Sequence, residues 1–256
     1  MKSHIYGIPV YSPTKLKELV FDYIIIASDK EDYVSEMKIQ LYKLNIEKAK
    51  ILSGIEIVGW NIEIISRYNW IKQIANWINI NNIRGNVAEC GVYRGDCAKF
   101  INVFFKNRKM YLFDTFEGFE EKDLNKERQF SDNNFLNGIF NENSNLFDDT
   151  NIEKVMSKME YPENVIVKKG WFPESTTDVE DRFCFVNLDM DLYQPILNGL
   201  EYFWNKMEQG GYILIHDYFN PMLPGVAKAV QDFEMKYGCC LNKFPIGDKC
   251  SIAIIK

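Results

Sequence analysis

The 256-residue chain lacks several features that would indicate particular classes of protein. Its six cysteines include no C-x-x-C pair, which argues against a zinc site and favours buried free thiols over disulfides. It has no block of like charges and a net charge of −6, so we expect neither nucleic acid nor a membrane as partner. It has no run of roughly 20 apolar residues and no apolar signal-peptide core, so we expect a cytoplasmic protein.

Residues 1–53 have the pattern of a small α/β extension. In order, they contain an extended IPVYSP, a helix from Pro13 to Leu19, a buried strand at DYIIIAS, an amphipathic helix from Tyr33 to Leu44 and a short strand at KAKIL. About two βα units cannot bury both faces of a sheet alone. No glycine-rich phosphate loop is present, so we favour packing against the main domain or a second subunit over nucleotide binding, and we expect a homo-oligomer.

Residues 54–256 predict a doubly wound, mostly parallel α/β sheet of seven strands. The spacing of isoleucines between residues 60 and 80 predicts a helix that leads into the first strand. The strands are predicted at Val87–Cys90, Met110–Phe113, Val165–Lys168, Cys184–Leu188, Tyr212–Ile215, Leu241–Phe244 and Ser251–Ile255. The tight turn Pro245–Lys249 between the last two favours an antiparallel hairpin at one edge.

A long polar insertion, about residues 117–162, follows the second of these strands. Segments of this length within a compact domain tend to be lids or disordered. Because the insertion starts at the carboxyl edge of the sheet, we predict a lid over the substrate. A surface loop without function is the alternative.

The stretch VAECGVYRGDCAKF, residues 87–100, is the first candidate for a cofactor site: a strand, an acidic residue, two glycines and a helix. Glycines let the backbone approach a ligand that the helix N-terminus faces. Glu89 would repel the phosphates of a dinucleotide and attract an amine or a cation. S-adenosylmethionine carries both an amine and a sulfonium. A structural strand-to-helix turn is the alternative.

Two further strand ends extend this site. Asp114 ends the next strand, in MYLFDTFEGF, where an acidic residue accepts hydrogen bonds from ribose hydroxyls. Trp171 follows another strand, in VKKGWFPES, where an aromatic side chain either flanks an adenine ring or packs in the core.

Two pairs of residues at later strand ends predict a metal site. Asp189 and Asp191 follow a buried strand and, being two residues apart, lie on one side of an extended chain. His216 and Asp217 end the following strand. Adjacent parallel strands bring both pairs to one edge, and uncompensated carboxylates favour a bound cation or a shared proton. The alternative is that Asp191 caps a helix and His216 packs at the surface.

Magnesium suits oxygen ligands alone, whereas an imidazole also admits manganese or iron(II). Hydroxyls bound to such an ion would have a lowered pKa, and a carboxylate or His216 would take the proton as the oxygen attacks the methyl group in line. We therefore predict catalytic roles for Asp189, Asp191 and His216, and metal ligation by Asp189, His216 and Asp217.

Over about residues 60–256, four segments together resemble the macrocin-type O-methyltransferases: AECGVYRGDCAKF, YLFDTFEGF, NLDMDLYQPILNGLEYF and GGYILIHDYFNPMLPGVAKAVQDF. The resemblance implies a Rossmann-like class I methyltransferase fold, S-adenosylmethionine, magnesium and the methylation of deoxysugar hydroxyls on macrolides. It implies that Asp189 and Asp217 hold the metal and that the cofactor is surrounded by Glu89, Gly91, Tyr93, Gly95 and Asp114. To these we add cofactor contacts from Thr115, Trp171 and Asp189. The family commonly has two aspartates where this chain has His216-Asp217, which leaves the metal open and a base role available to His216.

By analogy with similar enzymes of bacterial surface-polysaccharide synthesis, we expect a nucleotide-activated sugar as acceptor. A macrolide sugar and a catechol-type vicinal phenol are alternative acceptors, since the same metal chemistry serves them. An alternative of another class is a scaffold that binds a nucleotide without turnover.

Overall fold

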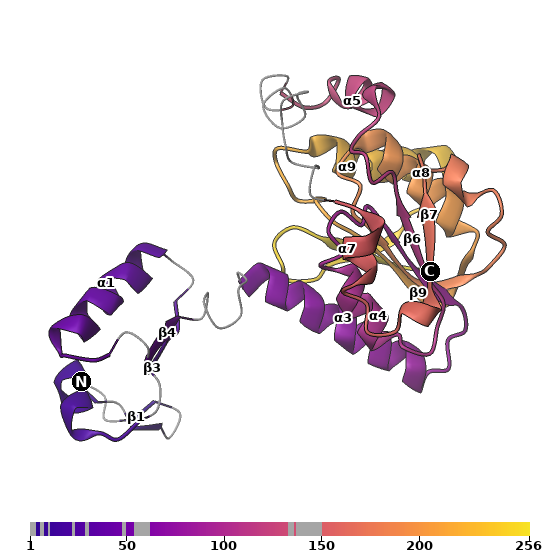
Figure 1. Ribbon diagram of the computed structural model, residues 1–256. Helices are drawn as coiled ribbons and strands as arrows, with labels where there is room; N and C mark the ends of the chain where they lie inside the picture. The colour runs from indigo at the N-terminus through magenta and orange to yellow at the C-terminus, as the bar shows by residue number, and fades with distance from the viewer. Residues whose placement is uncertain are drawn as a thin grey trace. The chain divides into compact units, whose positions relative to one another are not determined.

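The structure, a computed structural model, describes residues 4–5, 8–9, 11–21, 24–28, 31–47, 50–53, 62–132, 136 and 150–256. The chain forms two compact units, Met1–Ile65 and Ser66–Lys256 (Figure 1). The boundary predicted between residues 53 and 54 adjoins residues 54–61, which lie outside the described part, and it stays a prediction. No helix in the described ranges is long and apolar enough to span a membrane.

The first unit contains a small βαβ arrangement. Its elements are an antiparallel pair β1 (His4–Ile5) and β2 (Ile8–Pro9), a 3-10 helix (Pro13–Glu18), and parallel strands β3 (Ile24–Ile26) and β4 (Ile51–Ser53) connected through α1 (Glu31–Lys43). A core of Ile26, Val34, Leu41 and Ile51 holds it together. The strand predicted as buried is buried only in part: Ile26 is buried, but Ile25 is 62% exposed because successive side chains of a strand point to opposite faces.

The second unit contains a seven-stranded sheet, in the order β10-β11-β9-β8-β5-β6-β7. Its strands are β5 (Asn86–Cys90), β6 (Met110–Asp114), β7 (Val165–Lys169), β8 (Phe183–Leu188), β9 (Met207–Ile215), β10 (Asn242–Pro245) and β11 (Ile252–Ile255). Strands β5 to β9 are parallel, and β11 runs antiparallel to both β9 and β10. The predicted doubly wound fold with an antiparallel edge hairpin is therefore confirmed.

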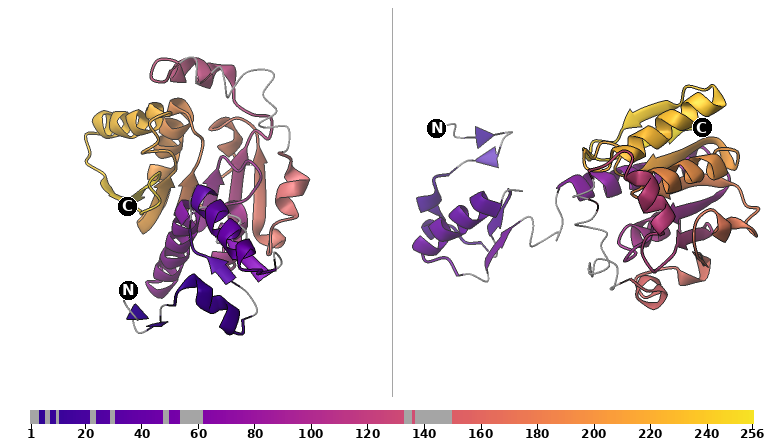
Figure 2. Two further views of the ribbon diagram at one scale, coloured as in Figure 1. Left: turned by 90° about the vertical axis from the view of Figure 1, so that its left-hand side faces the viewer. Right: turned by 90° about the horizontal axis from the view of Figure 1, so that it is seen from above.

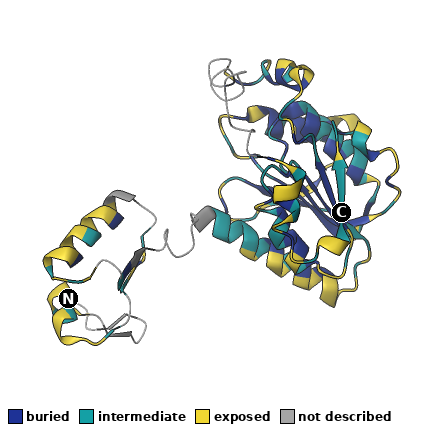
Figure 3. Cartoon of the chain, viewed as in Figure 1, coloured by how far each residue is buried: buried dark blue, intermediate teal, exposed yellow. Residues whose placement is uncertain are grey.

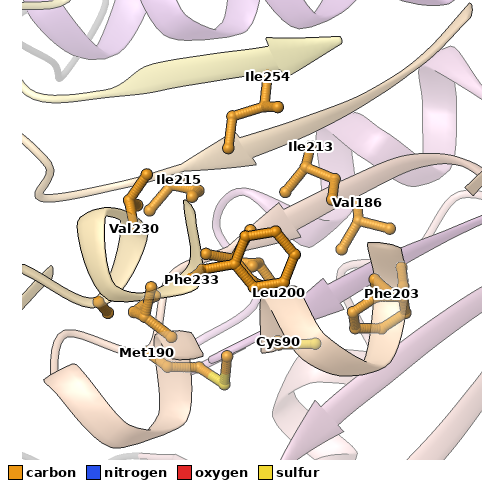
Figure 4. Close-up of a cluster of buried hydrophobic side chains, with 14 of the residues drawn as sticks. Cys90, Val186, Met190, Leu200, Phe203, Ile213, Ile215, Val230, Phe233 and Ile254 are labelled. Carbon is orange, nitrogen blue, oxygen red and sulfur yellow. The ribbon is translucent and has the colours of Figure 1, made fainter. Parts of the chain in front are cut away.

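Helices cover both faces of this sheet (Figures 1 and 2). On one face α8 (Tyr193–Trp204) and α9 (Pro224–Tyr237) pack on alternate strand residues, including Val186 and Ile213, which Figure 4 shows in one cluster with side chains of the two helices. On the other face α3 (Ile62–Ile80) and α4 (Ala98–Phe104) pack on the residues between, such as Phe185 and Leu214. Burial on both faces explains why the central strands are almost wholly apolar (Figure 3).

The described part of the long insertion includes two helices, α5 (Glu121–Glu127) and α7 (Ile152–Met156). Helix α5 is anchored on the sheet domain, because the fully buried Glu127 accepts a hydrogen bond of 2.7 Å from the backbone N–H of Tyr193, the first residue of α8. An acceptor at that position satisfies an amide that has no partner inside the helix. The start of the insertion is thus packed, whereas residues 133–135 and 137–149 lie outside the described part.

Strands β7 and β8 are linked by a segment with a short 3-10 helix, Glu174–Thr176, and another such helix, Pro162–Asn164, precedes β7.

The order of the strands indicates where the sheet would bind a ligand. From β5 the chain winds outward through β6 to β7, then returns to β8 on the other side of β5. The carboxyl ends of β5 and β8 flank the point where the winding direction reverses, which is where open α/β sheets bind ligands.

Candidate active site

A pocket with about 700 Å³ of empty space, counted out to its open mouth, lies at the carboxyl ends of β5, β6, β7 and β8. Seven residues predicted for the site line it: Gly91, Tyr93, Asp114, Thr115, Trp171, Asp189 and Asp191. Four others predicted for the site are absent from its lining: Glu89, Gly95, His216 and Asp217. The structure therefore brings together most of the predicted residues, and it leaves Glu89 one layer deeper than expected.

The pocket is strongly acidic. Among the described residues its lining contains no lysine and no arginine, but five acidic side chains: Asp114, Glu120, Asp123, Asp189 and Asp191. Such a wall repels phosphate groups and attracts cations. The lining suits the sulfonium and amine of S-adenosylmethionine and argues against a dinucleotide.

Gly91 allows β5 and β8 to approach each other at the bottom of the pocket. Its φ is +82°, and a Cβ at this position would lie 1.8 Å from the carbonyl oxygen of Asp189. The backbone N–H of Asp189 in turn donates to the carbonyl of Cys90 at 2.8 Å. Only glycine fits this crossing, so the sequence G-x-x-x-G begins with a residue that the local backbone requires.

Asp114 organises the loops around the pocket. Its Oδ2 accepts hydrogen bonds from the backbone N–H groups of Val92 (2.6 Å) and Tyr93 (2.9 Å), and its Oδ1 accepts one from Phe116 (2.7 Å). A carboxylate has about four acceptor positions, so one remains for a ribose hydroxyl. Thr115, the next residue, donates its hydroxyl proton to the carbonyl of Gly118 at 2.6 Å.

Glu89 is buried beneath the pocket and pairs with Asn187 across β5 and β8. Its Oε1 accepts a hydrogen bond of 2.8 Å from Asn187 Nδ2, while Glu89 Oε2 and Asn187 Oδ1 have no donor among the described residues. Burial raises the pKa of Glu89 to about 8, although the hydrogen bond from Asn187 opposes the shift. A ligand ammonium group would supply the missing donors, which fits the predicted role of Glu89 toward the cofactor amine.

The raised pKa of Glu89 predicts a pH-dependent stability in the absence of cofactor. Between its ordinary pKa of 4.5 and about 8, the folded protein holds a proton that the unfolded chain releases. The stabilisation is therefore present at low pH and is lost as pH rises through this window, by roughly 5 kcal/mol in total. Glu89→Gln should remove that slope in urea unfolding at pH 5, 6.5 and 8. Glu163→Gln, at an exposed position, is the control, and identical slopes in the wild type and Glu89→Gln would contradict the prediction.

Four ionisable side chains converge beside the pocket: Asp189, Asp191, His216 and Asp217. One ligand atom from each lies within 4.8 Å of the others. His216 Nδ1 is 2.9 Å from Asp189 Oδ1 and also contacts Asp217, whose Oδ1 accepts a 2.7 Å hydrogen bond from Asn220. Burial and the carboxylates of Asp189 and Asp217 raise the pKa of Asp191. The predicted convergence of both pairs at one sheet edge is thus present in the structure.

Strained backbone occurs at this edge. Four residues other than glycine have a positive φ there: Tyr93 (50°), Phe116 (55°), Asp191 (59°) and Asp217 (58°). A left-handed backbone costs free energy in residues with a side chain, and such residues gather at functional sites. The strain turns the chain sharply at the ends of the strands, so that side chains of Asp191 and Asp217 meet.

Two residues of the site, Arg67 and Asp248, were not predicted from the sequence. Arg67, from α3, donates to His216 Nε2, and its guanidinium lies 3.7 Å from Asp189 Oδ2 and 3.3 Å from Asp248 Oδ2. Asp248 is buried and accepts from the hydroxyl and backbone N–H of Ser251. A signal for Arg67 existed, because it is an arginine on the apolar side of a predicted helix. Asp248 offered none, since aspartate is common in turns.

The carboxylates of the cluster fit a divalent cation such as magnesium, which prefers oxygen ligands and relieves their mutual repulsion. His216 fits less directly. Because Arg67 donates to Nε2, that nitrogen keeps its lone pair and the ring proton lies on Nδ1, facing the carboxylates. A metal bound at Nδ1 would need the other tautomer, with its proton directed at Arg67. The arrangement therefore favours an oxygen-only ligand set.

A doubly wound sheet with an acidic pocket at its switch point and a carboxylate cluster beside it defines a methyltransferase of the Rossmann-like class. The family model for macrocin-O-methyltransferase (TylF) matches residues 53–244, and the chain belongs to this family. It is an S-adenosylmethionine-dependent O-methyltransferase, as the sequence predicted.

Known proteins of similar sequence and structure agree with this assignment. The chain is 22% identical over 189 residues, 68% of this chain and 67% of the relative, to 8-demethyl-8-(2,3-dimethoxy-alpha-L-rhamnosyl)-tetracenomycin-C 4′-O-methyltransferase of Streptomyces olivaceus. The O-methyltransferase NovP matches with a TM-score of 0.61 and 20% identity, over 75% of this chain and 80% of NovP. CalS11, a TDP-rhamnose 3′-O-methyltransferase, matches in its apo structure with a TM-score of 0.52 and 16% identity, over 94% and 98% of the two chains. The structural matches show a shared fold.

Proposed function

We propose that this O-methyltransferase acts on a sugar hydroxyl with the help of a divalent metal ion. The observation that carries the proposal is the junction of two acidic features: the pocket, whose described lining has no lysine or arginine, and the cluster of Asp189, Asp191, His216 and Asp217. Asp189 and Asp191 belong to both, so a methyl donor in the pocket and an ion at the cluster would lie next to each other.

The donor site consists of residues along the sheet edge. Gly91 admits the donor close to the backbone, Asp114 accepts from ribose hydroxyls, and Glu89 with Asn187 accepts from the amine. Tyr93, Thr115 and Trp171 line the same pocket. Gly95 follows in the β5–α4 loop, where its N–H donates to the carbonyl of Val92 at 2.8 Å and shapes the turn. S-adenosylmethionine supplies an electrophilic methyl group.

The metal site is proposed at the carboxylates of Asp189 and Asp217, whereas His216, predicted from the sequence as a third ligand, would need its other tautomer to bind the ion. A divalent cation held there would lower the pKa of a hydroxyl bound to it. Asp191 is the preferred proton acceptor, because it lines the pocket, whereas both ring nitrogens of His216 already have partners. The acceptor oxygen loses its proton to Asp191 and forms a bond to the methyl carbon as the carbon–sulfur bond breaks. Positioning of the two substrates supplies much of the remaining rate enhancement.

A nucleotide-linked sugar is the proposed acceptor, and surface-polysaccharide synthesis is the proposed setting. The name of CalS11, a TDP-rhamnose 3′-O-methyltransferase, supports a nucleotide-linked sugar. The tetracenomycin relative acts on a rhamnosyl group of a finished antibiotic, which supports a glycosylated small molecule as the second candidate. Because the chain belongs to a family of enzymes, a scaffold without turnover is set aside.

Three secondary proposals accompany this one. The insertion after β6 closes over the acceptor, since α5 already lies against the pocket with Asp123 in its wall. The first unit uses an apolar surface for packing, either within its own chain or against a second subunit in a homo-oligomer. Its exposed Ile25, Met37 and Ile39 support this proposal. The enzyme works in the cytoplasm, which is in keeping with six free cysteines.

A screen by mass spectrometry tests the function. The enzyme, S-adenosylmethionine and magnesium are incubated with TDP-rhamnose, other nucleotide sugars, glycosylated antibiotics and catechols, and each product is examined for a gain of one methylene. We expect methylation in the sugar groups and none of the catechols. Calorimetry with S-adenosylhomocysteine and NAD is run in parallel. Methylation of catechols alone would refute the sugar acceptor, and tight binding of NAD with none of S-adenosylhomocysteine would refute the donor site.

A further inference from the structure

Asp123 is a buried acid whose carboxylate has no role in the methyl transfer proposed above. It lies on α5, one turn before Glu127, so both side chains are on the same face of the helix. The carboxylate of Glu127 is fixed to the start of α8 by its hydrogen bond with Tyr193. That anchor holds Asp123, which is only 3% exposed, in the wall of the donor pocket.

The carboxylate of Asp123 is only half satisfied. Its Oδ2 accepts a hydrogen bond of 2.6 Å from the indole Nε1 of Trp171, whereas Oδ1 is buried with no donor among the described residues. An acceptor buried without a partner costs about 1–3 kcal/mol, and more if it is charged. Burial correspondingly raises the pKa of Asp123, although the Trp171 hydrogen bond opposes the shift. Asp123, which lines the pocket, therefore lacks one hydrogen-bond donor at Oδ1 among the described residues.

Trp171 is clamped by the same helix. The ammonium group of Lys122 lies 3.1 Å from the centre of its ring, and Asp123 holds its Nε1. A cation over an aromatic face and a hydrogen bond at its edge fix the indole in one orientation. Trp171 and Asp123 therefore form one rigid recognition element between the end of β7 and α5.

The order of strands fixes which part of the donor meets this element. The pocket runs from β8 and β5, where Asp189 and Gly91 lie, past Asp114 on β6 to Trp171 after β7. If the ribose is at Asp114 and the methyl group at Asp189, the adenine ring reaches the β7 end. Adenine has one exocyclic amine with two N–H groups. One of these N–H groups would supply the hydrogen-bond donor that Asp123 Oδ1 lacks.

We propose that Asp123 accepts a hydrogen bond from the 6-amino group of the donor's adenine and makes the site selective for adenine over 6-oxo purines. The proposal rests on the donor site described above. An ionised carboxylate is acceptor-only, so it attracts an amine and repels a carbonyl oxygen at the same position. In hypoxanthine the 6-position carries a carbonyl oxygen, so both this oxygen and the carboxylate of Asp123 would be hydrogen-bond acceptors.

The test compares S-adenosylhomocysteine with S-inosylhomocysteine in calorimetric titrations of the full-length protein. The wild type should bind the adenosyl compound about 10- to 100-fold more tightly, the range expected for a hydrogen bond to a charged group. Asp123→Asn should bring this ratio to about 1 or invert it. With the asparagine oxygen facing Trp171, its Nδ2 faces the base and donates to the 6-oxo group.

Glu121→Gln is the matched control, because it removes an acid from the same helix. Its side chain pairs with Arg128 at 2.8 Å and does not line the pocket, so the wild-type ratio should persist. Equal affinity of the wild type for both compounds would overturn the proposal without any variant, as would an unchanged ratio in Asp123→Asn. Failure of the wild type to bind S-adenosylhomocysteine at all would overturn the donor site itself. Strong binding without discrimination would leave the donor site standing and remove only the role of Asp123.

Discussion

Replacing Asp189 with asparagine should lower the rate of methyl transfer at least about 100-fold, while binding of S-adenosylhomocysteine changes far less. The expected loss of rate follows from the position of Asp189. Asp189 lines the pocket, lies 2.9 Å from His216 Nδ1 and belongs to the group of four potential ligands. Asparagine keeps the size of the side chain but removes the charge that would hold a cation. The rate is measured with a sugar acceptor identified in the screen, and donor binding by calorimetry.

Removal of metal should reproduce the effect in the wild type. A chelator should abolish turnover, magnesium should restore it, and magnesium should not rescue Asp189→Asn. Asp178→Asn provides the matched control, because this exposed acid pairs with Lys168 at 2.7 Å, away from the pocket. Undiminished turnover in chelator would refute the metal role of Asp189 and leave the assignment as an O-methyltransferase intact.

Gly91→Ala should destabilise the protein severely and eliminate donor binding. The new Cβ would lie 1.8 Å from the carbonyl oxygen of Asp189 and 2.6 Å from its carbonyl carbon, so the ends of β5 and β8 must separate. The φ of +82° adds backbone strain. We expect a loss of about 3–5 kcal/mol in the free energy of unfolding, in the range of the most damaging single substitutions.

Gly247→Ala separates the two causes. Gly247 has a similar φ of +86°, but a Cβ there meets nothing within 4 Å. Its replacement should cost only the strain of a left-handed backbone, about 1–2 kcal/mol. Urea unfolding of both variants measures the difference. Equal losses would mean that strain, and not the contact with Asp189, makes glycine necessary at position 91.

The strands and their order of appearance were predictable because each depends on local sequence. The apolar runs that end in Glu89, Asp114, Asp189 and His216 mark buried strands with polar tips. The one strand predicted wrongly in its burial, at Ile24–Ile26, belongs to a two-stranded sheet, and the sequence does not reveal how many neighbours a strand has. Likewise β9 extends back to Met207, five residues before its predicted start, through two glycines that read as a turn.

Within the site, the sequence indicated which residues come to the sheet edge but not what each of them touches. Glu89 was expected against the cofactor, and the sequence did not reveal that this side chain lies beneath the pocket and pairs with Asn187 of β8. His216 was expected as ligand or base, and the ring is held between Arg67 and the carboxylates. These are properties of pairs of residues, and no pattern within a single strand contains them.

By itself the amino-acid sequence determined the family, the winding of the sheet and the acidic character of its carboxyl edge, because hydrophobic periodicity and the residue that ends each strand are local. Only the tertiary structure decided that Arg67 meets His216 across 149 residues of chain, and that Asp123 meets Trp171 across 48. The reason is that α3 packs on the sheet through apolar side chains and α5 packs against α8, and neither kind of packing specifies which polar groups come into contact at the edges of the packed surfaces.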